Sequence, residues 1–253
     1  MEKYFVDKNS IVRKIWGKAD TVLFIFAGAA AEFALNKAVD WLYFTGRLPS
    51  DPLARLFSTV EYAGQIIFSE ESKALASIDR ITAIHQDVEK KRNDKIPDWA
   101  YRDVLYLLID YSIRSYELLE RMLTKEEKAE VFEVFLSVGN RMQLADLPVD
   151  YSQWRLSREE HLNENLIKSD FTADLYYQYK KQLGAIRYAI LKQVQFQLVP
   201  ARVSYLLGLK NKYWLIPLLK FYKQLRMMKL DTRLKSTLLP AAYKVRILQL
   251  DVN

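Results

Sequence analysis

The sequence contains no cysteine and only two histidines, His85 and His161. The lack of cysteine excludes disulfide frameworks, thiol nucleophiles, iron–sulfur clusters and cysteine-bound zinc. Two histidines are too few for a three-histidine zinc site. A ferritin-like di-iron site is excluded as well, because it needs a glutamate three residues before each of two histidines, where this chain has Thr82 and Arg158.

Glycine and proline are also scarce. Each occurs seven times in 253 residues, which together is less than half of their usual share. Sheets with many tight turns need more of both, whereas long helices tolerate little of either. The chain also lacks the glycine-rich loops that bind nucleotide phosphates and the Gly-x-Ser-x-Gly turn of hydrolases. With half of its residues apolar and 27% charged, the sequence predicts a globular, all-α protein.

Helix signals follow one another along the whole chain. Ser10 precedes a short apolar pattern that stops at Gly17, and Thr124-x-x-Glu and Ser157-x-x-Glu have the spacing of capping boxes. No linker divides the sequence, so we expect ten to twelve helices, no strand and a single domain over residues 1–253. The longer expected helices cover about 21–44, 52–67, 69–92, 99–123, 124–143, 157–168, 171–182, 185–196, 201–207 and a last pattern from 211 to about 232.

His85 lies inside an apolar stripe. Ala74, Ile78, Ile81, His85 and Val88 are spaced by four, three, four and three residues, which places them on one face of a helix. A neutral imidazole in an apolar wall can ligate haem iron from the proximal side. The alternative is a packed histidine that hydrogen-bonds the backbone, and the pattern alone favours this alternative.

Arg55 and Thr59 are four residues apart on the preceding expected helix and therefore face the same way. An arginine beside an apolar seam can pair with haem propionates or a polarised oxygen, and a threonine hydroxyl can donate to bound dioxygen. Taken alone, both residues fit better an arginine that reaches water and a threonine that bonds its own helix. His161 stands in a mostly charged stretch and is expected at the surface.

Basic residues gather in the last quarter of the chain. From Lys180 to Arg246 there are fifteen Lys or Arg and one acidic residue, Asp231, a net charge of +14 within a total of +7. Aromatic residues are interleaved with these bases, which suits an anionic membrane surface or single-stranded nucleic acid. A helix that packs its aromatics inward and exposes its lysines gives the same string, and we prefer that interpretation.

Two segments taken together resemble a known family. Asp51-Pro-Leu-Ala-Arg-Leu-Phe-Ser-Thr59 is followed by Arg80-Ile-Thr-Ala-Ile-His-Gln-Asp-Val88, and this order is similar to the mpaB/rubber oxygenase family. Weaker matches are Phe26-Ala-Gly-Ala-Ala-Ala31, Ile96-Pro-Asp-Trp-Ala-Tyr101 and Leu239-Pro240. The resemblance extends over about residues 12–246.

The resemblance implies an all-helical, globin-like arrangement around one haem b. His85 matches the family's proximal iron ligand, and Arg55 and Thr59 match its arginine and threonine beside the haem. Better-known members add dioxygen across an isoprenoid double bond and release carbonyl products. Position 58 is Ser, where some latex-clearing proteins carry a lysine, so a lysine-ligated resting iron is not expected.

The leading hypothesis is thus a haem b-dependent oxygenase that acts with dioxygen on an apolar alkene or isoprenoid-type molecule. The alternatives are a non-catalytic helical protein that binds haem or lipid, and a basic peripheral membrane protein without haem; no nucleic acid is expected. The first residues lack a signal-peptide pattern, and the apolar run Thr21–Ala31 is shorter than the about 20 residues that span a bilayer. We therefore expect a cytoplasmic protein, with peripheral membrane contact through the basic quarter.

Overall fold

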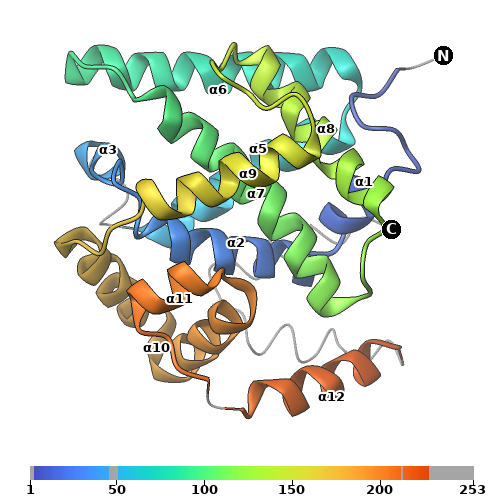
Figure 1. Cartoon of the computed structure of the whole chain (residues 1–253), viewed down its shortest axis with the longest axis vertical. Helices are drawn as coiled ribbons and strands as arrows, with labels where there is room; N and C mark the ends of the chain where they lie inside the picture. Colours follow the sequence, from blue (N-terminus) through green and yellow to red (C-terminus); the bar gives the residue numbers. More distant parts are fainter. Residues whose placement is uncertain (1–2, 46–50, 212, 228–253) are drawn as a thin grey trace.

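The protein is all-helical in the computed structural model, which describes residues 3–45, 51–211 and 213–227 (Figure 1). Within α5 and α12, the side chains of residues 52–57 and 225–227 lie outside the description. About three quarters of the chain that is described is helical, and its only β-type pairings are two isolated bridges. The predicted all-α class is therefore confirmed. The helices are α1 Ile11–Trp16, α2 Ala19–Phe33, α3 Asp40–Phe44, α5 Pro52–Phe68, α6 Glu71–Arg92, α7 Asp98–Leu119, α8 Lys125–Arg141, α9 Tyr151–Glu164, α10 Asp170–Leu198, α11 Ala201–Leu207 and α12 Leu215–Met227.

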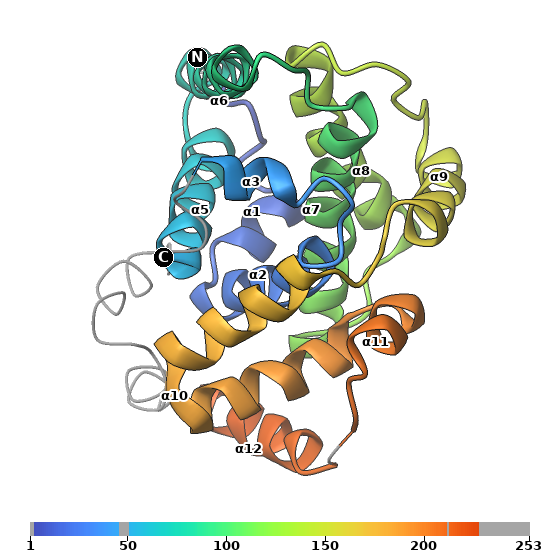
Figure 2. The same cartoon turned by 90° about the vertical axis from the view of Figure 1, so that its left-hand side faces the viewer.

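Helices α2 and α7 pack together at the centre and are surrounded by the others (Figures 1 and 2). Their close approach depends on Gly28 of α2. A Cβ atom at this position would lie 2.2 Å from the ring of Tyr111 on α7, closer than any van der Waals contact allows. Both views place α6 at one end of the molecule and α10 with α12 at the other.

Several helix ends follow the rules that the sequence suggested. The Ser10 side chain accepts from the backbone N–H of Val12, and Thr124 and Glu127 form the expected capping box at α8. Helix α5 begins at Pro52, where the missing N–H costs nothing. These caps are local, which is why the sequence alone identifies them.

The expected helix over residues 21–44 is wrong, because α2 ends at Phe33 and α3 begins only at Asp40. The Asn36 side chain accepts from the N–H of Ala38 and so competes with the helical hydrogen bonds. The same segment pairs with the chain after α9, where the N–H of Ile167 donates to the carbonyl of Leu35. A partner remote in sequence therefore ends this helix.

Two further boundaries differ from expectation. Helix α9 begins at Tyr151 rather than after Ser157, because Asp150 accepts from the N–H of Gln153 and caps the earlier turn. The expected break between 182 and 185 is present as Gly184, whose φ of 73° interrupts α10 with a kink that suits glycine.

Candidate active site: an apolar cavity with an imidazole on its wall

A cavity of about 330 Å³ lies between the central helices and α5, α6 and α8. Its wall is mostly apolar and includes the small residues Ala29 and Ala30 of α2, together with Ile66, Leu105 and Val138. The volume falls at the lower end of the range for small-molecule and cofactor sites. A mostly apolar wall of this kind favours an apolar occupant.

His85 is part of this wall. The apolar stripe expected from the sequence is present on α6: Ala74 and Ile78 are buried, and two turns after Ile78 His85 is half-buried beside the cavity. Its ring meets the ring of Tyr101 edge-on, at 5.2 Å between centroids. The Tyr101 hydroxyl donates to Glu89 at 3.0 Å. Burial is the main cause that raises the pKa of Tyr101, and the Glu89 carboxylate raises it further.

Thr59 and its neighbour Ser58 line the same cavity from α5. Arg55 lies one turn earlier on the backbone of α5, but its side chain is outside the described residues. The structure therefore brings Thr59 and His85 to one cavity from two different helices.

Other polar residues on the wall were not identified from the sequence. Asn36, Tyr101 and Tyr179 come from the segment after α2, from α7 and from α10. No local pattern distinguishes them, because the sequence has sixteen tyrosines. Only the packing of α10 against α2 and α5 brings Tyr179 to the cavity.

A network of buried charges lies between α2, α7 and α9. Arg158 of α9 forms a two-pronged ion pair with Glu32 of α2, with Nη2 2.6 Å from Oε2, and its Nη2 also donates to Asp110 of α7 at 3.0 Å. Arg158 and Glu32 are only 3% and 1% exposed. The Tyr111 hydroxyl donates to the same Glu32 at 2.8 Å, and burial raises the pKa of this phenol well above its usual value. We call Glu32, Asp110, Tyr111 and Arg158 the buried ion network.

His161 extends this network toward the cavity, so the expectation that it lies at the surface is wrong. It is 5% exposed, and its Nδ1 contacts Asp103, which also accepts from the Asn36 amide at 2.7 Å. Burial raises the pKa of Asp103, and His161 offsets part of that shift. The charged neighbours in sequence are misleading, because Glu159 and Glu160 lie on the outer face of α9 while His161 turns inward.

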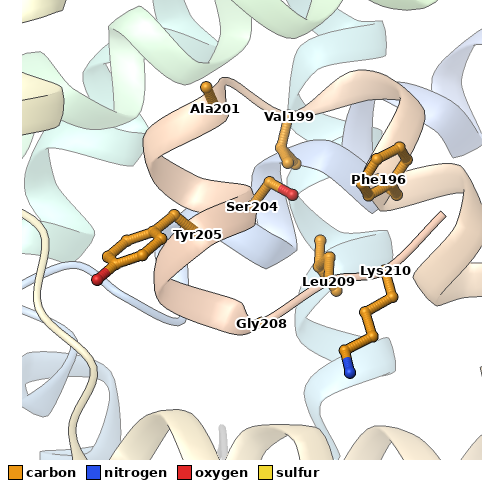
Figure 3. Close-up of a pocket in the computed structure, with 8 residues that line it drawn as sticks. All are labelled: Phe196, Val199, Ala201, Ser204, Tyr205, Gly208, Leu209 and Lys210. Atoms are coloured by element: carbon orange, nitrogen blue, oxygen red, sulfur yellow. The ribbon is translucent and has the colours of Figure 1, made fainter.

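Figure 3 shows a second depression, around α11 and the end of α10. Val199, Ser204 and Leu209 point into it, whereas Tyr205 points away. Its rim is exposed and it is separate from the cavity that contains His85. It holds no acid, histidine or arginine, so we do not treat it as the site.

Within the described ranges, no three His, Asp or Glu side chains gather in a way that could hold a metal ion by themselves. A haem makes a smaller demand, because its macrocycle supplies the other iron ligands and the protein need contribute only an axial one. The cavity offers one imidazole on a mostly apolar wall, and this donor set fits a haem. None of the helices in the described part of the chain is long and apolar enough to cross a membrane.

Fold and site together define an all-helical protein with a cofactor-sized apolar cavity and a histidine on its wall. The family model described as ER-bound oxygenase mpaB/B'/Rubber oxygenase, catalytic domain, matches residues 13–226. The chain therefore belongs to the mpaB/rubber oxygenase family, and the family resemblance expected from the sequence is confirmed. No curated protein and no solved structure matches the chain significantly. Membership of this family indicates that the protein is an oxygenase. An oxygenase in general uses dioxygen and a small-molecule substrate.

Proposed function

We propose that the protein is a haem b-dependent oxygenase that acts with dioxygen on an apolar alkene or isoprenoid-type substrate. The observation that carries the proposal is His85 on the wall of a mostly apolar cavity, in a chain of an oxygenase family. The globin-like arrangement and the single domain over residues 1–253 remain part of this proposal.

In this proposal the His85 imidazole would hold the haem iron, and the apolar part of the wall would hold the macrocycle. The haem supplies the activation of dioxygen when it is bound. Thr59 lines the cavity and can offer its hydroxyl to a polar atom there. Arg55 is proposed for the same side on the strength of its position one turn before Thr59. The cavity orients the substrate and excludes water from it.

The iron ligand is tested by His85→Ala. The purified wild-type protein is expected to have a Soret band, and the variant is expected to lose most of its haem. Added imidazole should restore the band to the variant, because it can occupy the space that the side chain leaves. Gln86→Ala, which alters an exposed neighbour, serves as the control. Full haem content in His85→Ala with an unchanged spectrum would refute the ligand assignment.

The oxygenase reaction is tested with dioxygen labelled with oxygen-18 and unsaturated isoprenoids of increasing length. We expect labelled carbonyl products from the haem-loaded protein and none from His85→Ala. A protein that binds haem but gives no labelled product with any alkene would leave only the role of a haem carrier.

A second proposal concerns the basic C-terminal quarter as a membrane contact. Between residues 175 and 230 the sequence has eleven Lys or Arg and no acidic residue. Leu215 and Leu219 bury one side of α12, whereas Ile216 and Phe221 on its outer side are 42% and 54% exposed beside Lys220. Apolar and basic side chains on one outward face are typical of a helix that lies on an anionic bilayer.

The membrane contact is tested by sedimentation with liposomes. We expect binding to anionic vesicles at low salt, release at high salt, and a loss of binding in Lys220→Glu/Phe221→Ser. Lys90→Glu, which reverses an exposed charge on α6 at the opposite end of the molecule, should bind like the wild type. Equal sedimentation with neutral and anionic vesicles, or none with either, would contradict the proposal.

A further inference from the structure

Tyr179 combines deep burial with a hydroxyl that has no protein partner. The residue is 7% exposed and lines the cavity that contains His85. Among the described residues, none of the hydrogen bonds involves its hydroxyl. The oxygen is not fully covered either, so the little surface that Tyr179 keeps includes this oxygen.

A hydroxyl on a residue this buried usually has a protein partner, because a polar group that is largely shielded from water without a hydrogen bond costs free energy. The neighbouring tyrosine gives the contrast. Tyr176, whose ring centroid lies 5.8 Å from that of Tyr179, donates its hydroxyl to Gln195 at 2.9 Å. Gln195 in turn donates to the carbonyl of Ala27 at 3.1 Å, so this second hydroxyl belongs to a link between α10 and α2. The Tyr179 hydroxyl has no such structural role.

The position of Tyr179 in the cavity indicates what it can bind. It comes from α10, whereas His85 comes from α6, and the two helices lie at opposite ends of the molecule (Figure 2). Burial raises the pKa of the Tyr179 phenol, so the group is a neutral O–H donor at physiological pH. The wall beside it is apolar, with Ala30, Phe33 and Leu42.

We propose that Tyr179 is a specificity-determining residue that donates its hydroxyl to an acceptor oxygen at one end of an otherwise apolar ligand. The ligand class is an apolar chain that carries a carbonyl, ether or hydroxyl oxygen, held with that oxygen toward α10 and with its hydrocarbon part toward His85. The direction of the ligand rests on the proposed function, whereas the hydrogen bond to Tyr179 does not.

The test measures binding rather than turnover. The probes are a linear isoprenoid methyl ketone and the hydrocarbon in which a methylene replaces the carbonyl. Their dissociation constants are measured on the full chain as purified, through the displacement of an apolar fluorescent dye. A change in cavity volume or dye affinity in the variant affects both constants alike, so the ratio of the two constants is compared between the wild type and the variant. We expect Tyr179→Phe to lower the preference for the ketone about 5-fold, the usual worth of one neutral hydrogen bond.

Tyr176→Phe is the matched control, because it makes the same chemical change one helical turn away. It should leave the ketone preference unchanged but lower the melting temperature, since a hydroxyl bonded to Gln195 is lost. Tyr179→Phe should keep or raise the melting temperature. An unchanged ketone preference in Tyr179→Phe would overturn the inference.

Haem content, read from the Soret band, is measured on the same samples and separates the two proposals. If the wild-type protein contains no haem, and Tyr179→Phe still lowers the ketone preference, the haem proposal is contradicted but the role of Tyr179 is supported. A Tyr179→Phe protein that loses haem and keeps its ketone preference would show that the hydroxyl serves the cofactor, and would overturn the inference about the ligand.

Discussion

Replacing Arg158 with methionine removes the central cation of the buried ion network while keeping a long, flexible side chain. The change leaves the buried carboxylates of Glu32 and Asp110 without the cation between them. Asp110 retains a second cation, because Nε of Arg114 donates to it at 2.7 Å. Glu32 retains only neutral or more distant partners, namely the Tyr111 hydroxyl and Nε2 of His161 at 3.8 Å.

Breaking a buried ion pair from one side costs about 3–5 kcal/mol, because the remaining charge has lost its partner and cannot reach water. For a chain of this length, we expect a fall in melting temperature of about 6 to 20 °C. Thermal and urea unfolding followed by circular dichroism would measure both quantities.

The control is Arg141→Met. Arg141 also forms a two-pronged pair, with Asp79 at 2.7 and 2.6 Å, but both side chains are about half exposed. Water and salt screen an exposed pair, so this variant should remain close to the wild type. Similar losses for Arg158→Met and Arg141→Met would refute the assigned role of burial.

A double variant tests the pairing itself. Glu32→Gln removes the charge that Arg158→Met leaves without a partner, so the two changes together should cost about 1–3 kcal/mol less than the sum of the single changes. Strict additivity would mean that the two residues stabilise the fold independently, which their geometry contradicts.

Two other predictions follow from local geometry. Gly28→Ala should lower the free energy of unfolding by about 1–3 kcal/mol, because its Cβ would enter the Tyr111 ring. Gly64→Ala, with nothing within 4 Å of its Cβ, should be neutral or stabilising in the same urea titration. Equal effects of the two changes would contradict the close approach of α2 and α7. The guanidinium of Arg121 and the N–H of Thr124 lower the pKa of Glu127 to about 2 from its ordinary value near 4.5. The stability that this carboxylate contributes is present above pH 4.5 and is lost as the pH falls toward 2, so Glu127→Gln should flatten that part of the pH–stability curve, and an unchanged slope would contradict the assignment.

The helices that the sequence predicted well are those whose ends depend on local chemistry. Ser10, Pro52 and Thr124 act on residues within one turn, and the pattern of their neighbours is sufficient to identify them. The end of α2 depends instead on pairing between Leu35 and Ile167, more than 130 positions apart. No window of sequence contains both partners, and the expected helix was therefore too long.

The same distinction applies to the site. The stripe on α6 gave the direction of His85, because apolar spacing identifies one face of a helix. It could not reveal that Tyr179 of α10 reaches the same cavity, or that Arg158 and His161 turn away from their charged neighbours toward Glu32 and Asp103. A charged stretch predicts an exposed helix only if the core contains no opposite charge to pair with it. Here buried carboxylates on α2 and α7 pair with Arg158 and His161.

The two faces of α2 have opposite effects on stability. Toward the cavity it presents Ala29 and Ala30, small side chains that leave space empty and forgo packing energy. On the side toward α7 and α9, Gly28 and Glu32 give a close helix contact and a hydrogen-bonded ion pair, neither of which tolerates a shift of the helix. Because a loosely packed wall cannot fix its own position, the contacts behind it must do so. The buried ion network thus holds α2 in place while its other face lines the cavity.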